Sequence, residues 1–348
     1  MEDLDTLVLR TAVGWQSAGQ SVVLVTVART WGSSPRPPGS LMALNGQGET
    51  VGSVSGGCIE DDLIRRLREG GVQAVCATGT PTVQRYGISA DEAHRFGLPC
   101  GGTVELVLEP VAAHSRLGEL LQACQQRRSS ERVLDLQSGQ VALREGRRDG
   151  VPHLDARHLT TYLGPQARLI LIGAGDLSRF MAQMALGLGF EVIVCDPREE
   201  HRDSGRMDGV QISHEMPDDL ILRLKPDART AVVALTHDPK LDDLALIDAL
   251  QSEAFYVGAI GSRRHSALRR ERLHEHFDLS HTDVGRLHSP AGLYIGSKTP
   301  AEIALSIMAE VVALKNGVAA REPMPVAAGK ATLEPHPPPA RTAPVCAA

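Results

Sequence analysis

The stretch Arg168-Leu-Ile-Leu-Ile-Gly-Ala-Gly-Asp-Leu-Ser178 decides the fold of the second half of this chain. Residues 168–172 read as a buried strand, and the glycine turn that follows leads into a helix expected to continue to Leu188. Gly189 ends that helix, and residues 190–195 form a second apolar strand that stops at Asp196. Strand, glycine turn, helix, strand and an acid about 20 residues after the glycines are the fingerprint of a Rossmann-like dinucleotide-binding domain.

Each residue of this fingerprint has an expected role. Gly173 allows the tight turn, and Gly175 lets a pyrophosphate approach the N-terminus of the helix. Ser178 stands where a third glycine is usual, which changes the contact between helix and strand. Asp196 is the candidate partner of a ribose hydroxyl.

Two later strands end in polar residues that belong to the same candidate site. Residues 230–235 lead to His237, and residues 255–260 lead to Arg263. In open α/β sheets the ligand lies beyond the carboxyl ends of the strands, so His237 is a candidate acid–base or ligand group and Arg263 a candidate phosphate clamp. The alternatives are an ordinary surface histidine and a solvated helix start.

The front half contains a second distinctive stretch, Val51-Gly-Ser-Val-Ser-Gly-Gly-Cys-Ile-Glu60. Gly56 and Gly57 permit backbone angles closed to other residues, and they deliver Cys58 to the start of a helix expected over 58–68. The helix dipole favours a thiolate there, but the acids of the first turn oppose it. A small buried cysteine behind a glycine turn is the competing interpretation.

Two neighbouring stretches are candidates to assist this thiol. The loop at 30–40 carries Ser33, Ser34 and Arg36 among three prolines, so it suits an anion, although a plain connecting loop explains it equally well. Cys100 is also flanked by a Gly-Gly pair. Two thiols are too few for a structural zinc, but they suit a soft metal or a sulfur-bearing ligand that brings its own donors.

The composition excludes several classes of protein. A chain of 348 residues with 42% hydrophobic and 22% charged residues is typical of a soluble protein of about two domains. A net charge of −6 argues against a general nucleic-acid binder. We find no signal peptide and no apolar run long enough to span a membrane, so a cytoplasmic location is expected. Six cysteines without a CxxC pair are expected to be free thiols.

The expected architecture is α/β with four parts. Residues 1–112 form an α+β domain, 113–165 a bridging segment, 166–318 the Rossmann-like domain and 319–348 a disordered, proline-rich tail. Helices are expected at 4–18, 58–68, 117–126, 176–188, 239–250 and 300–316; strands are expected at 21–29, 40–44, 50–54, 72–78, 82–86, 103–108, 132–136 and 140–144, besides those named above.

Four motifs together resemble the XdhC/CoxI family, the xanthine dehydrogenase accessory proteins. They are residues 32–39, 52–60, 97–102, and the stretch from Ile260-Gly-Ser-Arg through Ile295-Gly-Ser-Lys-Thr-Pro-Ala-Glu-Ile303. With the Rossmann core, the resemblance covers about residues 5 to 318. It implies an N-terminal XdhC/CoxI-type domain followed by the Rossmann-like domain.

The resemblance implies a chaperone that carries molybdenum cofactor (molybdopterin) without catalysing a reaction itself. Such proteins bind the cofactor, allow its sulfuration by a cysteine desulfurase, and insert it into xanthine dehydrogenase or a related molybdenum hydroxylase. Cys58 and Cys100 are then the expected metal donors. Gly56, Gly57, the Ser33–Ser34–Arg36 loop and Arg263 are expected around the pterin phosphate.

Two other functions remain open at this stage. An NAD(P)-dependent oxidoreductase is favoured by the Rossmann fingerprint, although we recognise no hydride-transfer site such as Tyr-x-x-x-Lys. A nucleotide-sensing regulatory module explains the fingerprint but leaves both cysteine turns without a role. Whether the chain forms a homo-oligomer is also open.

Overall fold

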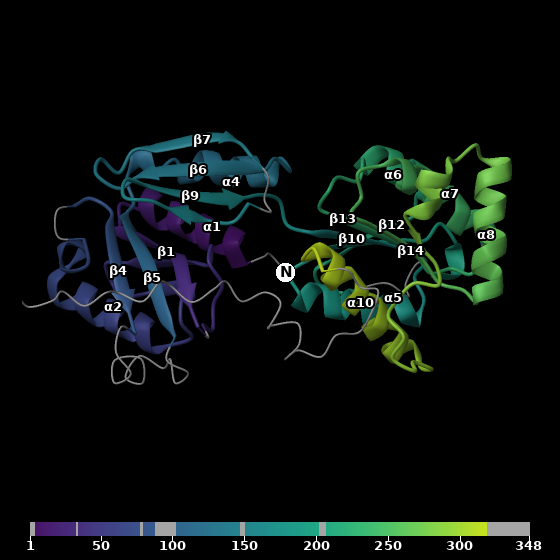
Figure 1. Ribbon diagram of the computed structural model, residues 1–348, viewed down its shortest axis with the longest axis horizontal. Coiled ribbons are helices and arrows are strands. Elements are labelled where there is room, and N and C mark those ends of the chain that lie inside the picture. The colour runs from purple at the N-terminus through teal and green to yellow at the C-terminus, as the bar shows by residue number, and fades with distance from the viewer. Residues whose placement is uncertain are drawn as a thin grey trace, which may run out of the picture.

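The chain folds into two lobes joined by one extended connection (Figure 1). The computed structural model describes residues 4–32, 34–76, 79–87, 102–146, 150–201 and 207–318. An N-terminal lobe contains a five-stranded sheet A and a four-stranded sheet B, and a C-terminal lobe contains a six-stranded sheet C. Among the described residues, no helix has both the length and the apolar character needed to cross a lipid bilayer.

Sheet A is antiparallel, with strand order β3-β2-β1-β5-β4. Its central strand β1 is almost entirely buried because both faces of the sheet are covered. Val23 and Val25 face helix α2, whereas Val22 and Leu24 face α1 and α4. The elements are α1 (Leu4–Ser17), β1 (Val22–Trp31), β2 (Leu41–Asn45), β3 (Thr50–Gly52), α2 (Cys58–Gly70), β4 (Thr82–Tyr86) and β5 (Thr103–Pro110).

One predicted strand of this lobe is wrong. Residues 72–78 were expected to be extended, but Val72–Ala74 is a short 3-10 helix and Val75–Cys76 continue as a turn. Gly71 ends α2 with a φ of 64°, and the backbone N–H groups of Val75 and Cys76 bond back to Val72. The chain therefore reverses immediately, and a strand at this position has no neighbour to pair with.

The bridging segment forms a small antiparallel sheet of its own. Helix α4 (Leu117–Gln125) precedes sheet B, whose strand order is β7-β6-β9-β8. The predicted hairpin around Ser138-Gly139 is confirmed by β6 and β7. Leu120 and Leu163 pack with α1, so this segment completes the N-terminal lobe. The strands are β6 (Ser130–Asp135), β7 (Val141–Glu145), β8 (His153–Leu154) and β9 (His158–Leu163).

Sheet C is parallel throughout, with strand order β12-β11-β10-β13-β14-β15. Counted from β10, this is the order 3-2-1-4-5-6 of the doubly wound dinucleotide-binding fold. The strands are β10 (Arg168–Ile172), β11 (Glu191–Cys195), β12 (Val210–Ser213), β13 (Thr230–Ala234), β14 (Tyr256–Ala259) and β15 (Leu287–His288). The helices are α5 (Asp176–Gly187), α6 (Pro217–Leu224), α7 (Pro239–Gln251), α8 (Arg263–His276), α9 (His281–Gly285) and α10 (Pro300–Lys315).

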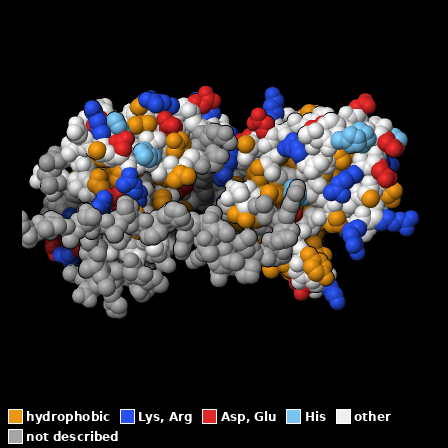
Figure 2. Space-filling model, in the orientation of Figure 1, with side chains coloured by type: hydrophobic (Ala, Val, Ile, Leu, Met, Phe, Trp, Pro, Cys, Tyr) orange, Lys and Arg blue, Asp and Glu red, His pale blue; other side chains and the backbone are white. Residues whose placement is uncertain are grey.

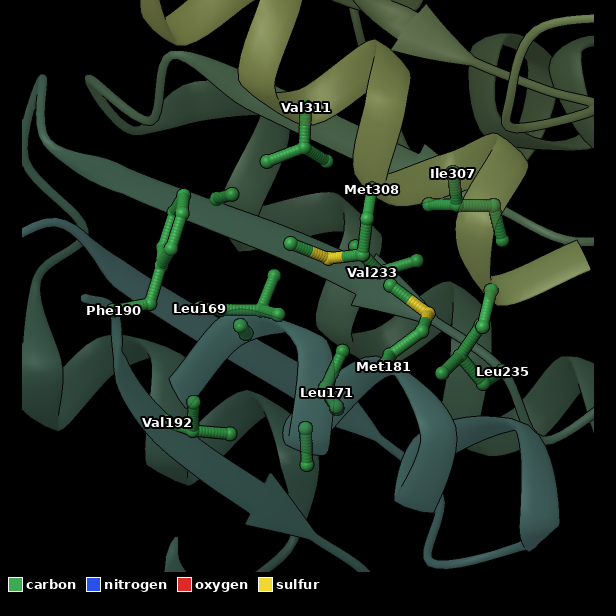
Figure 3. Packing of buried hydrophobic residues seen from close by; sticks show 14 of the residues in the cluster. Leu169, Leu171, Met181, Phe190, Val192, Val233, Leu235, Ile307, Met308 and Val311 are labelled. Atoms are coloured by element: carbon green, nitrogen blue, oxygen red, sulfur yellow. The ribbon is translucent and has the colours of Figure 1, made fainter. Parts of the chain in front are cut away.

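Helices cover both faces of sheet C, as a buried parallel sheet requires. Figure 3 shows Met181 of α5 and Met308 of α10 converging on the same face as Leu169, Leu171 and Val233. The opposite face carries Ile170, Ile172 and Val232 with residues of α6 and α7. This burial fixes where the strands end, and the strand ends carry the candidate ligand residues.

The lobes meet at the amino ends of sheet C. Arg127, which follows α4, donates to both carboxylate oxygens of Asp227 at 2.8 and 3.0 Å and to Glu191 at 3.2 Å. Glu191 begins β11, and Asp227 lies three residues before β13. The carboxyl ends of the strands therefore point away from the N-terminal lobe.

Candidate functional site

The topology of sheet A gathers the N-terminal motifs at one edge. Trp31 at the end of β1 pairs with Thr103 at the start of β5, and Gly52 at the end of β3 pairs with Met42 near the start of β2. The loop at 32–39, the turn at 53–57 and the segment that precedes Gly102 therefore all leave the sheet from this edge, which we call the thiol edge. Ser33 and Cys100 lie outside the described residues.

Cys58 is the first residue of α2 and its side chain is exposed. The other described cysteines, Cys76, Cys124 and Cys195, are buried. Burial raises the pKa of the Cys76 thiol to about 11 and that of the Cys195 thiol to about 12, so both are protonated at neutral pH. Within the part of the chain that the structure describes, Cys58 is thus the one cysteine presented to a ligand.

The turn before Cys58 is held by the buried carboxylate of Glu60. Its Oε1 accepts the backbone N–H groups of Val54, Ser55 and Gly56 at 2.8, 2.8 and 3.1 Å, and its Oε2 accepts that of Gly57 at 2.9 Å. The hydroxyl of Ser53 donates to Oε1 at 2.8 Å, and the hydroxyl of Ser55 donates to Oε2. Six donors from five consecutive residues thus converge on one side chain.

This set of bonds keeps Glu60 ionised. Burial on its own raises the pKa of a carboxyl group, but hydrogen bonds from Ser55 and Ser53 outweigh burial and hold the pKa of Glu60 far below its usual range. Since the N–H groups of Gly56 and Gly57 are bonded to Glu60, these two donors do not face a ligand. Sequence reasoning assigned Glu60 only to the helix dipole; an acid three residues after the helix N-cap was the available signal.

The proline-rich loop lies beside the turn. A Cβ built on Gly56 would come within 4.0 Å of the Pro35 side chain. The Ser34 hydroxyl donates to the Arg36 carbonyl at 3.0 Å, which fixes the loop locally, and the Arg36 side chain is half-buried. The structure therefore brings Ser34, Arg36, Gly56, Gly57 and Cys58 to the same edge.

The second group of candidate residues lies at the carboxyl ends of sheet C. Gly173 has a φ of 107°, and a Cβ there would lie 2.9 Å from the Thr236 methyl group, so glycine is required. A Cβ on Gly175 would meet nothing within 4 Å, which leaves the start of α5 open to a ligand. Ser178 is buried and its hydroxyl donates to the Gly173 carbonyl. The serine thus braces the turn from inside.

Asp196 is already occupied by the protein. It is 1% exposed, and its Oδ2 accepts the Ala174 N–H at 2.8 Å. Arg198 bonds to both carboxylate oxygens through its side chain, at 2.9 and 2.8 Å, and to Oδ1 through its backbone N–H at 3.1 Å. A ribose hydroxyl finds no unused lone pair on this carboxylate unless Arg198 moves away. Sequence reasoning missed Arg198, although it stands two residues after the acid.

His237 and Arg263 are exposed residues of the same edge. His237 has a φ of 62°, an uncommon angle for a side-chain-bearing residue. It lines a cleft of about 230 Å3 with His265 and Arg272, whereas Arg263 begins α8 outside it. In Figure 2, Lys, Arg and His side chains gather over the end of the C-terminal lobe where α8 lies.

The two groups of residues face different directions within one chain. Arg127 fixes the N-terminal lobe to the amino ends of sheet C, and a five-residue strand spans about 17 Å. Figure 1 accordingly places α8, which follows the carboxyl end of β14, on the far side of its lobe from the N-terminal lobe. The thiol edge and the carboxyl edge do not form one cleft in this arrangement.

The donor set at the thiol edge fits a metal that arrives with ligands of its own. Among the described residues, no group of three or more His, Cys, Asp or Glu side chains could enclose a metal ion. Cys58 offers a single soft donor, which suits a metal already held by a dithiolene.

Comparisons with known proteins agree with this architecture. Residues 15–87 match the XdhC and CoxI family, and residues 169–311 match the XdhC Rossmann domain. The first match ends just after β4 and contains Cys58; the second runs from β10 into α10 and contains the glycine turn.

Three relatives extend over both lobes. The molybdenum cofactor insertion chaperone PaoD of Escherichia coli is 26% identical over 318 residues, which cover 88% of each chain. A protein of Bacillus subtilis, named as a probable xanthine dehydrogenase component, is 26% identical over 328 residues, covering 86% of this chain and 95% of the relative. A crystal structure described as a xanthine dehydrogenase from Bacillus halodurans superposes with a TM-score of 0.71 at 26% identity, covering 93% of this chain and 98% of the other.

Proposed function

This chain belongs to the XdhC and CoxI family, and from that premise we propose that it is a chaperone for molybdenum cofactor. It binds the cofactor, keeps it protected while a cysteine desulfurase supplies the terminal sulfur, and inserts it into xanthine dehydrogenase or a related molybdenum hydroxylase. The names of the relatives in Escherichia coli and Bacillus subtilis support the class of cargo and the class of client.

One observation carries the proposal: an exposed thiol begins a helix behind a turn that is locked in place. A pterin dithiolene gives its metal two sulfur ligands, so a single protein thiolate can complete the soft donor set. Cys58 supplies this donor in our proposal, and Cys100 is proposed as the second. Gly56 and Gly57 keep side-chain bulk away from the approaching metal.

The remaining candidate residues divide between the two edges. Ser33, Ser34 and Arg36 are proposed to contact the phosphate end of the cofactor at the thiol edge. Gly173, Gly175, Ser178, Asp196, His237 and Arg263 are proposed to form the nucleotide-type site of the carboxyl edge, where Ser178 and Asp196 act by holding the turn. The cytoplasmic location remains a prediction.

Replacing Cys58 with alanine tests the cargo and the donor together. We expect protein isolated from a molybdate-fed host to carry molybdenum and pterin in the wild type, and the Cys58→Ala variant to lose at least nine-tenths of both. Elemental analysis and mass spectrometry of the released pterin measure this. Cys76→Ala is the matched control because that thiol is buried. Unchanged molybdenum and pterin in Cys58→Ala would remove this thiol from the metal.

The rival function is an NAD(P)-dependent oxidoreductase, which the strand order of sheet C and the open start of α5 favour. The occupied Asp196 argues against it, because NAD needs that carboxylate for its ribose. Turnover of NAD(P) with aldehydes or hydroxy acids discriminates the two. Steady NADH or NADPH production by the purified chain would replace the chaperone proposal.

A further inference from the structure

The turn at 53–57 has the form of an anion site that the protein fills itself. Consecutive backbone N–H groups that point to one centre normally bind a phosphate or another oxyanion. Here the N–H groups of Val54, Ser55, Gly56 and Gly57 all point to the Glu60 carboxylate. The carboxylate comes from the first turn of α2, two residues after Cys58.

We propose that Glu60 is the positioning residue of the thiol edge: it fills the N–H nest of the turn, fixes Cys58 in its exposed position, and leaves sulfur as the group that the turn offers. Where this concerns the cofactor, it rests on the proposed function. The cofactor then meets the turn with its metal end, because the four N–H donors that would hold its phosphate are taken. Arg36 is the nearby cation that remains for the phosphate.

Burial and backbone geometry support this role. Glu60, Ile59 and Val54 are buried, whereas Cys58 between them is exposed. Gly56 and Gly57 have φ values of 100° and 148°, which the loop keeps only while something holds it. A carboxylate that accepts six hydrogen bonds is such a restraint, and each bond to a charged acceptor is stronger than a neutral one.

The neighbouring acid provides a matched control. Asp61 occupies the same first turn and carries the same charge, but its side chain is exposed. Asp61→Asn therefore removes one negative charge beside Cys58 and leaves the nest filled. Glu60→Gln removes the same charge and also replaces one accepting oxygen with a donor, which opposes the N–H groups.

Amide hydrogen exchange on the full-length protein tests the nest directly. We expect the amides of residues 54–57 to exchange at least tenfold faster in Glu60→Gln and Glu60→Ala than in the wild type, and to keep wild-type rates in Asp61→Asn. The amides of Leu63 and Leu67, in the buried face of α2, should keep their protection in all variants. Wild-type exchange at 54–57 in both Glu60 variants would overturn the proposal.

Cofactor affinity and chemical rescue test the positioning role. We expect molybdenum cofactor to bind at least tenfold more weakly to Glu60→Gln and Glu60→Ala, and with wild-type affinity to Asp61→Asn. Sodium formate should restore exchange protection and affinity to Glu60→Ala, because a free carboxylate can enter the emptied nest. Faster exchange with unchanged affinity, or no rescue by formate, would overturn the role of Glu60.

The outcomes separate this inference from the proposed function. If wild-type protein binds no cofactor, the chaperone proposal fails, while exchange and formate rescue still judge Glu60. If both Glu60 variants fail to fold, Ser53→Ala provides the milder test, since it removes one donor to Oε1. Faster exchange at residues 54–57 in Ser53→Ala supports the inference, and unchanged exchange contradicts it.

Discussion

The ionisation of Glu60 is coupled to folding of the N-terminal lobe. Its pKa in the folded protein lies far below the value of about 4.3 expected for an unfolded chain. A carboxyl group with a depressed folded pKa stabilises the protein fully above its unfolded pKa, and this stabilisation is lost as the pH falls toward the folded pKa. The direction of the effect is therefore fixed: acid weakens the turn.

Glu60→Gln should lower the free energy of unfolding by about 1–3 kcal/mol, because buried donors lose their acceptor. The difference from wild type should be complete above about pH 5 and should shrink as the pH falls below about 4.3. Urea unfolding at a series of pH values measures it. A difference that stays constant down to about pH 3 would contradict the assigned pKa direction.

Two glycines of the Rossmann turn should respond differently to a methyl group. Gly173→Ala places a Cβ 2.9 Å from the Thr236 side chain at a φ of 107°, so we expect a loss of about 1–3 kcal/mol. Gly175→Ala meets nothing within 4 Å at an ordinary φ of −83°, so stability should change by less than about 0.5 kcal/mol. Thermal unfolding of both variants measures the contrast; equal losses would contradict this explanation.

At the residue scale, the sequence predicted the parts that a local pattern encodes. The start of α2 at Cys58 follows from glycines before it and apolar spacing after it. The filled nest does not, because six donors converge on Glu60 only once the turn is folded. Asp196 was identified correctly as the acid after the second strand, but its occupation by Arg198 depends on side-chain geometry that spacing does not express.

Among the helices, α10 has the most complete set of end signals. Thr299 accepts the N–H of Glu302, and the Glu302 side chain accepts the N–H groups of Lys298 and Thr299. Pro300 occupies the first helical position. Further along, Glu310 accepts bonds from the Tyr256 hydroxyl and the Gly292 N–H, both at 2.7 Å, which fasten the helix to sheet C and to the loop before it.

Thr299→Ala should lower stability by about 1 kcal/mol, because the helix loses its N-cap acceptor. Thr299→Ser keeps the hydroxyl and should stay within about 0.5 kcal/mol of wild type. Chemical denaturation followed by circular dichroism measures both variants. An equal loss in the serine and alanine variants would show that the hydroxyl is not the stabilising group.

Elements with strong periodicity or caps were predictable, and short ones were not. The predicted helix at 300–316 and the strands at 168–172 and 230–235 are confirmed within a residue or two. Strand β12 and helix α6 were missed because Val210–Ser213 is only four residues long and α6 only eight. Residues 72–78 misled because a β-branched run exists there without a partner strand. Residues 88–101, with Cys100, lie outside the described residues.

The lobes of the whole molecule are held together by one arginine more than by any apolar contact that we describe. Arg127→Ala removes bonds to Asp227, to Glu191 and to the Gln166 carbonyl. We expect the lobes of this variant to unfold in separate calorimetric transitions, with a larger radius of gyration by small-angle scattering. Arg128→Ala is the control, since the Arg128 side chain bonds to Gln126 within its own lobe. A single transition and an unchanged radius in Arg127→Ala would contradict the assignment.

The outward-facing carboxyl edge of sheet C has a consequence for traffic on a carrier of this shape. A recipient enzyme large enough to cover Cys58 would rest on the N-terminal pole, while the other pole still faced bulk water. Donor and recipient would thus not compete for floor space, and a ternary assembly is geometrically permitted. A cargo handed over at one end need not wait for the opposite end to be vacated.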